Sequence, residues 1–181
     1  MVALVGLVTL VFLIQQTEAT RQQAEEAASQ VTASRLDGIY EQLLTWDQFW
    51  SSTENKRLNL LARQADDYDE IKDPEEREQL YSTNVWFLDY FDYVYTTLPG
   101  LLRGCVPEDG HLVLRGSPEE SQVCDEWVAW SQTIYNAFIY DKPLCQTLND
   151  APEIYERKFV GAIRDSRACR PNAGRSSGSM H

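Results

Sequence analysis

Residues 1–14 read MVALVGLVTLVFLI, an unbroken apolar run, and no charged side chain appears before Glu18. A helix needs about 20 residues to cross the hydrocarbon core of a bilayer, with about 17 as a practical minimum. At about 1.5 Å per residue, the uncharged residues 1–17 reach about 26 Å, which suffices if the last three lie among the headgroups. We therefore expect residues 1–17 to form a transmembrane anchor. Its lipid-facing side chains would be Val2, Leu4, Val5, Leu7, Val8, Leu10, Val11, Phe12, Leu13 and Ile14.

Two other interpretations of this run stay open. A secretory signal peptide has a similar apolar core, and Thr17-Glu18-Ala19 resembles a small-x-small cleavage site, although no basic residue precedes the run. A helix buried in a protein core would also be apolar along its length.

The segment from Glu18 to Trp50 continues the helical pattern. It contains no proline, and its only glycine is Gly38. Apolar residues recur at steps of three and four, as on one face of an amphipathic helix. These residues are Ala24, Ala27, Ala28, Val31, Leu36, Ile39, Tyr40, Leu43 and Leu44. We expect one long helix that leaves the bilayer and becomes the first helix of the following domain.

The orientation of the anchor depends on one residue. Arg21, on the C-terminal side, is the only basic side chain near the apolar run. Because basic residues next to a membrane helix prefer the cytoplasm, we expect the C-terminal domain on the cytoplasmic side of a bacterial inner membrane.

The chain is acidic, with 16 basic and 28 acidic residues and a net charge of −12. Such a surface repels nucleic acid and anionic headgroups, so neither is expected as a general partner. Acidic residues concentrate in residues 65–92 and basic residues from Arg157 onward. The two regions either attract each other within the fold, or leave Arg164, Arg167 and Arg170 to face an acidic partner or headgroups.

Four cysteines occur, without a CxxC motif or another paired spacing. They are Cys105, Cys124, Cys145 and Cys169. A zinc site is not expected at these spacings. The cysteines fit small buried apolar residues, or two disulfides in an oxidising compartment, and the sequence does not decide between these states.

Capping patterns predict where three helices begin. Asp73-Pro74-Glu75-Glu76 places a capping side chain, a proline in the first turn and a glutamate at the third position, which predicts a helix over 74–98 that ends at Pro99-Gly100. Ser117–Glu120 repeats the pattern and predicts a helix over 118–140. The looser pattern at Asp150–Glu153 predicts a helix over 152–167. Shorter helices are expected at 53–63 and 144–148, the latter after the break at Asp141-Lys142-Pro143.

The predicted helices carry aromatic and apolar stripes that favour packing in a helix bundle. The stripe residues are Leu80, Tyr81, Val85, Trp86, Leu88 and Phe91, then Trp127, Trp130, Ile134 and Phe138, then Ile154, Tyr155, Phe159 and Ile163. Trp46, Phe49 and Trp50 close the first helix. We therefore expect an all-α chain in which the transmembrane helix continues into a four- to five-helix bundle over 18–170, followed by a flexible tail over 171–181.

Residues 99–117, PGLLRGCVPEDGHLVLRGS, interrupt this bundle as a small glycine-rich insert. Residues 111–115 are expected to pair with 101–103 as a hairpin. Because a long loop in a bundle often carries function, Arg103 and His111 are candidate partner-facing residues together with the basic residues near the C-terminus.

No catalytic motif occurs in the structural context that its chemistry requires. The chain lacks HExxH and a phosphate loop. A GxSxG spacing occurs at residues 174–178, in the expected flexible tail, and a single Glu-x-x-His occurs at residues 108–111, in the insert. Neither lies at a strand-to-helix turn or on paired bundle helices, where these motifs act. Close in sequence lie Cys105, Glu108, Asp109 and His111, but a polar turn easily produces such a group. Cys105 with His111 as its base, and the Asp89/Asp92 pair, are weaker candidates for chemistry. We expect no catalytic residue, no metal site and no cofactor.

The N-terminal half resembles a family of uncharacterised bacterial single-pass membrane-anchored all-α proteins. The resemblance rests on residues 12–21, FLIQQTEATR, on residues 40–44, YEQLL, and on the spacing of Trp127, Trp130, Tyr155 and Phe159, and it covers residues 5–165. This chain departs from the family pattern in being less basic after the anchor and in carrying the glycine-rich insert. The resemblance implies a membrane helix followed by an all-α domain and no assigned activity.

These observations favour a non-catalytic interaction or scaffold subunit, held at the bilayer and accessory to a larger integral membrane complex, for instance a respiratory or photosynthetic assembly. Its partners would be the lipid bilayer and other integral membrane subunits. A membrane-tethered sensor or small-ligand module is the alternative, with a cavity at Trp86, Trp127 and Tyr135 or in the insert as its pocket. An enzyme is the third class.

Overall fold

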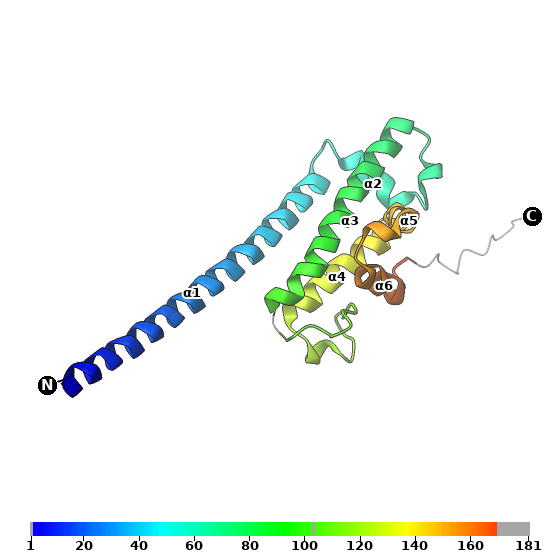
Figure 1. The fold of residues 1–181 in the computed structure, drawn as a ribbon. Helices are drawn as coiled ribbons and strands as arrows, with labels where there is room; N and C mark the ends of the chain where they lie inside the picture. The colour runs from blue at the N-terminus through cyan, green and yellow to red at the C-terminus, as the bar shows by residue number, and fades with distance from the viewer. Residues whose placement is uncertain (1, 103, 170–181) are drawn as a thin grey trace, which may run out of the picture. The chain divides into compact units, whose positions relative to one another are not determined.

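All regular secondary structure in the described part of the chain is helical. The computed structural model covers residues 2–102 and 104–169, with side chains described from residue 16 onward. The helices are α1 (Val2–Ser51), α2 (Lys56–Gln64), α3 (Pro74–Leu102), α4 (Asp125–Tyr140), α5 (Lys142–Asp150) and α6 (Arg157–Ser166), with the short 3-10 helices η1 (Tyr68–Glu70), η2 (Glu120–Gln122) and η3 (Pro152–Ile154) (Figure 1). The all-α class is therefore confirmed. The chain divides into two compact units, Met1–Thr45 and Trp46–His181.

The first unit consists of most of α1. The helix runs without a break from Val2 to Ser51, which confirms the expected continuation of the N-terminal helix. Within the side chains that the structure describes, no helix combines the length and the apolar character that crossing a bilayer requires. The side chains expected to face lipid, from Val2 to Ile14, lie outside that described set.

α3 is the central helix of the second unit. It packs against α2, α4, α5 and α6. Its buried residues are Leu80, Asn84, Phe87, Leu88, Tyr90, Phe91, Val94, Tyr95 and Leu98. The last turns of α1 belong to this unit, because Trp46 packs on Phe87 and Phe91 with ring centroids 4.8 and 5.1 Å away, and Trp50 stacks on Phe87 at 5.5 Å. Burying each such aromatic side chain stabilises the fold by about 2–3 kcal/mol.

The predicted start of α3 is confirmed, but its predicted end is wrong. Asp73 Oδ1 accepts hydrogen bonds from the backbone N–H of Glu75 and Glu76, at 2.9 and 3.4 Å, as a capping aspartate should. The helix continues past Pro99 to Leu102. Leu98 is fully buried, and the packing of this end of α3 outweighs the one hydrogen bond that the proline removes.

The starts of α4 and α6 were predicted too early. The pattern at Ser117–Glu120 leads into η2 rather than into α4, which begins at Asp125, because Cys124 is held extended just before it. The pattern at Asp150–Glu153 likewise opens η3 alone. The buried Tyr155 is extended, and α6 begins at Arg157.

The aromatic stripes are buried in part. The stripe of α4 is confirmed, since Trp127, Trp130, Ile134 and Phe138 are all buried. Three residues predicted to line the core are instead exposed: Tyr81, Trp86 and Ile154, at 41%, 45% and 69%. In α3 the expected stripe was too wide for a single buried face.

The hairpin predicted within residues 99–117 is wrong. Leu101 and Leu102 are part of α3, and the described residues after Gly104 form turns and irregular chain without a strand. The insert is therefore shorter than expected at its N-terminal side. The 171–181 tail lies outside the described residues.

Candidate functional site: the braced loop between α3 and α4

The segment from Gly104 to Cys124, here called the braced loop, is closed by a disulfide. Cys105 and Cys124 form an S–S bond across 19 residues. Beside it, the Cys124 N–H donates to the Cys105 carbonyl at 3.0 Å. The two ends of the loop are thus joined covalently and by a backbone hydrogen bond, and Cys124 leads directly into α4.

The tip of the braced loop is held by two aromatic side chains from the core. The Gly110 N–H donates to the Pro107 carbonyl at 3.0 Å, which closes a turn. The Tyr95 hydroxyl donates to the Gly110 carbonyl at 2.6 Å, and Trp127 Nε1 donates to the His111 carbonyl at 3.2 Å. A Cβ at Gly110 would lie 2.4 Å from Tyr95 Oη, and its φ is +73°, so only glycine fits. The loop has a fixed shape although it lacks regular structure.

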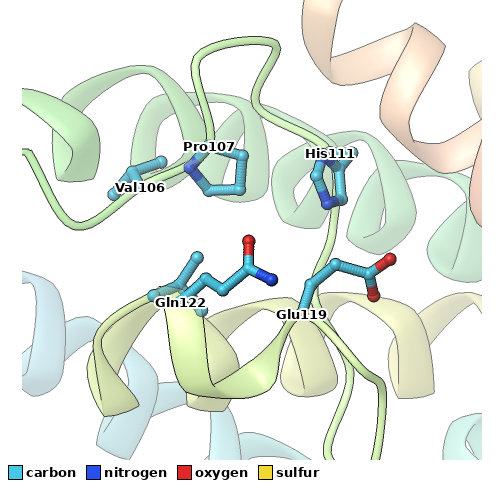
Figure 2. Close-up of a pocket in the computed structure, with 6 residues that line it drawn as sticks. Val106, Pro107, His111, Glu119 and Gln122 are labelled. Atoms are coloured by element: carbon cyan, nitrogen blue, oxygen red, sulfur yellow. The ribbon is translucent and has the colours of Figure 1, made fainter.

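The two sides of this loop, the later of which includes η2, border a small open cavity of about 120 Å³. It is lined by Val106, Pro107, His111, Glu119, Gln122 and Val123. Figure 2 shows Val106, Pro107 and His111 on one side of the space, and Glu119 and Gln122, from the later part of the loop, on the other. The lining combines three apolar residues with three polar ones.

The His111 ring in this cavity is oriented by Asp109. His111 Nδ1 lies 2.7 Å from Asp109 Oδ1, and the same oxygen accepts the His111 backbone N–H at 3.2 Å. The side-chain hydrogen bond from His111 is the main cause that lowers the pKa of Asp109. Because the ionised carboxylate can only accept, Nδ1 carries the proton of this hydrogen bond.

The structure excludes Cys105 as a nucleophile or metal ligand, two roles that its position near His111 in the sequence allowed. Its sulfur is in a disulfide, so it is neither a nucleophile beside His111 nor a thiolate ligand. The Glu108 carbonyl accepts from Lys158 Nζ at 3.5 Å. Within residues 16–102 and 104–169, no three His, Cys, Asp or Glu side chains gather in a way that suits a metal ion.

The predicted partner-facing residues are not brought into one site. His111 lines the cavity of the braced loop, whereas Arg164 and Arg167 are exposed at the end of α6. Arg167 caps α6 in the left-handed region, with φ +64°, and its N–H donates to the Arg164 carbonyl at 3.2 Å. Arg103 and Arg170 lie outside the described residues.

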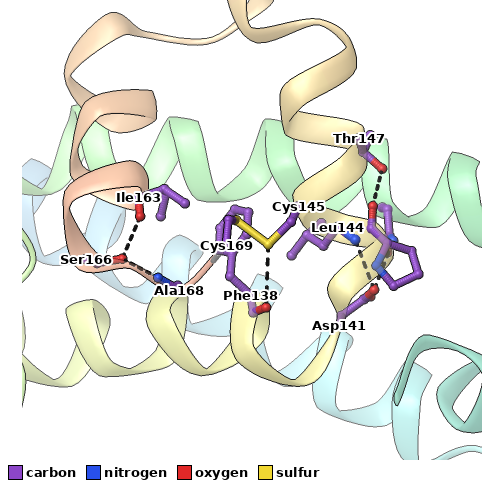
Figure 3. The surroundings of a disulfide bond; sticks show 11 residues. Phe138, Asp141, Leu144, Cys145, Thr147, Ile163, Ser166, Ala168 and Cys169 are labelled. Atoms are coloured by element: carbon purple, nitrogen blue, oxygen red, sulfur yellow. Dashed lines mark hydrogen bonds between the residues drawn. A yellow bond between two sulfur atoms is a disulfide. The ribbon is translucent and has the colours of Figure 1, made fainter. Parts of the chain in front are cut away.

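A second disulfide joins Cys145 of α5 to Cys169 after α6, across 24 residues. Figure 3 shows it between the end of α4, at Phe138, and the turn at Ser166 and Ala168. The Ser166 hydroxyl donates to the Ile163 carbonyl at 2.7 Å and accepts the Ala168 N–H at 3.3 Å, so this turn is also locally closed. All four cysteines are therefore paired.

A buried polar network, absent from the sequence-based predictions, joins η1, α3 and α5. Asn84 Nδ2 donates to Tyr68 Oη at 2.9 Å and to Asp141 Oδ1 at 3.3 Å. Tyr68 Oη lies 2.7 Å from Thr147 Oγ1, which donates to the Pro143 carbonyl at 3.0 Å. Since the threonine proton is engaged by that carbonyl, the Tyr68 hydroxyl donates to Thr147 and accepts from Asn84.

Asp141 is the one ionisable carboxyl in this network. It precedes α5 and accepts the Leu144 N–H at 3.1 Å (Figure 3). Burial raises its pKa to about 7, and the hydrogen bonds from Leu144 and Asn84 offset part of that effect. Asn84 Oδ1, fully buried beside it, has no hydrogen-bond partner. An asparagine within a predicted apolar helix face was the only sequence signal of this arrangement.

Comparison of the chain with protein-family models, with curated proteins and with solved structures finds no match.

Proposed function

We propose that this chain is a non-catalytic interaction subunit, anchored in a membrane by the start of α1, whose helical domain faces an oxidising compartment and binds a larger integral membrane complex. The observation that carries the proposal is a domain braced by two disulfides with aromatic side chains held exposed on its central helix.

The apolar run supports the anchor. Residues 1–14 are apolar without interruption in the sequence, and the backbone from Val2 onward is helical and continuous with the domain. A helix of this kind satisfies its own backbone hydrogen bonds, as a lipid environment requires.

The disulfides favour the side of the membrane opposite to the one that Arg21 suggests. Disulfides persist in periplasmic, extracellular and similar oxidising spaces and are rare in the cytosol. Pairing of all four cysteines is stronger support than the charge of one arginine, because the orientation rule depends on an excess of basic residues. We therefore place the domain outside the cytoplasm in this proposal.

Exposed aromatic residues on α3 support the interaction role. Trp86 and Tyr93 are 45% and 48% exposed and lie seven residues apart, hence on one face of the helix. The Trp86 ring stacks on Tyr90, with centroids 6.4 Å apart, and contacts Phe87 at 5.0 Å. Rigid aromatic side chains that stay exposed are typical energetic centres of protein interfaces.

Purification of the tagged full chain in a mild detergent tests the interaction role. The double variant Trp86→Ala, Tyr93→Ala should lose the co-purifying integral membrane subunits. The matched variant Ile154→Ala, which removes a 69% exposed apolar side chain from η3, should keep them. Recovery of this chain alone, as a monomer, from wild-type cells would refute the proposal.

Alkylation in intact cells tests the compartment separately. The four thiols should resist a membrane-permeant alkylating reagent and should react after treatment with a reductant that cannot cross the inner membrane. Immediate alkylation of all four thiols without reductant would place the domain in a reducing compartment and contradict this part of the proposal.

A further inference from the structure

We propose that the cavity of the braced loop binds a primary ammonium group on an alkyl stem, as presented by a lysine side chain of the partner polypeptide. This inference rests on the proposed interaction role and specifies the chemistry of the partner. It uses a surface distinct from Trp86 and Tyr93 of α3.

Two hydrogen-bond acceptors line the cavity. The Glu119 carboxylate is exposed, and the ion pairs among the described residues do not include it. The Gln122 side-chain oxygen is the second acceptor. An ammonium group has three donors and no acceptor, so it matches this pair.

The size and the apolar lining of the cavity suit an alkyl stem. A volume of about 120 Å³ holds roughly four or five non-hydrogen atoms, which is the length of a lysine side chain beyond its Cα. Val106, Pro107 and Val123 supply apolar contacts along it. Lysine stems ordinarily pack on apolar surface while the charged end stays at a polar mouth.

The surrounding charge favours a cation. The acids of residues 105–126 are Glu108, Asp109, Glu119, Glu120, Asp125 and Glu126, and the only base there is Arg115. One sign of charge around a concave site raises the local concentration of the opposite ion and its association rate. Lys158, the nearby base of α6, has its Nζ at the Glu108 carbonyl, 3.5 Å away.

The cavity is formed before any ligand arrives. The Cys105–Cys124 disulfide joins the two sides of the loop, and the Tyr95 and Trp127 side chains hold its tip. Preorganisation of this kind lowers the ordering cost of binding, so a single side chain can be recognised.

Titration of the full chain in detergent micelles with n-butylamine tests the inference. The reporter is the indole N–H resonance of Trp127, which donates to the His111 carbonyl at 3.2 Å next to the cavity. We expect a saturable shift with n-butylamine and none with n-butanol, which has the same stem without the charge. Glu119→Gln should weaken apparent affinity about tenfold or more by removing a charge-assisted hydrogen bond. Glu126→Gln, an exposed acid of α4 outside the cavity lining, should change it less than twofold.

An equal response to n-butanol, an unchanged affinity in Glu119→Gln, or no saturable shift would overturn the inference. The wild-type chain, titrated and purified as above, separates the two proposals. If the membrane partner co-purifies with it while n-butylamine fails to bind it, the lysine pocket is wrong and the interaction role stands. If n-butylamine binds as expected while no partner co-purifies from wild-type cells, the interaction role fails and the pocket serves a free amine.

Discussion

Replacing Asp141 by asparagine should remove a pH-dependent loss of stability. Asp141 is 9% exposed, and its pKa rises from 3.8 to about 7 in the folded chain. Between these two values the folded state binds the proton that the unfolded state releases, so the free energy of unfolding falls as pH rises. The shift is about 3 pH units, and each unit corresponds to about 1.36 kcal/mol. The stability that depends on protonated Asp141 is therefore at most about 4 kcal/mol, and it is fully lost above about pH 7.

The assay is urea unfolding of the full chain at pH 4, 5, 6, 7 and 8, followed by tryptophan fluorescence. The informative quantity is the difference between wild type and Asp141→Asn at each pH, because the other carboxyl groups cancel in it. This difference should grow in favour of the variant as pH rises, and the new amide N–H₂ also offers a donor beside the unpaired Asn84 Oδ1. Asp150→Asn, at an exposed position of α5, should keep the wild-type slope. Parallel profiles for wild type and Asp141→Asn would refute the reasoning.

Three further substitutions test other parts of the fold by the same unfolding measurement. Gly110→Ala should destabilise the fold by about 2–4 kcal/mol, because the new Cβ would lie 2.4 Å from the buried Tyr95 hydroxyl at a residue with positive φ. Gly100→Ala, inside α3 with no atom within 4 Å of the new Cβ, should be neutral or stabilising. Similar costs at both sites would contradict this. The double variant Cys145→Ser, Cys169→Ser should lose about 2–4 kcal/mol by opening a 24-residue loop, and a wild-type unfolding midpoint would count against it. Tyr68→Phe should cost about 1–3 kcal/mol by leaving buried polar groups unpaired, and no change would show that water replaces the hydroxyl.

Local signals predicted the helices, and tertiary contacts decided where several of them begin and end. The Asp73 cap acts within one turn, so it could be recognised from four residues. The similar pattern before Glu120 opened only a 3-10 turn, because the hydrogen bond and disulfide between Cys105 and Cys124 hold the chain extended at the residue before α4. That contact spans 19 residues and leaves no local trace in the sequence.

The candidate site was predictable only as a region. The glycines and prolines near His111 indicated an irregular loop, and this expectation located the cavity within a few residues. Its opposite wall, with Glu119 and Gln122, was assigned to a helix instead, and the pairing of the cysteines was left open. The network around Asn84 could not be predicted, because its partners come from segments 16 to 57 residues away.

The order of the cysteine pairs has a consequence for how the protein matures. Cys105 joins Cys124 and Cys145 joins Cys169, so each thiol bonds to its immediate neighbour along the chain. Four cysteines allow three connectivities, and this is the one in which neither loop encloses or crosses the other. If the chain enters an oxidising compartment N-terminus first, as the proposed function requires, the first bridge can close before the third thiol arrives. An oxidase that joins thiols in order of emergence would then produce the native pairs directly, with no wrong bridge for an isomerase to undo.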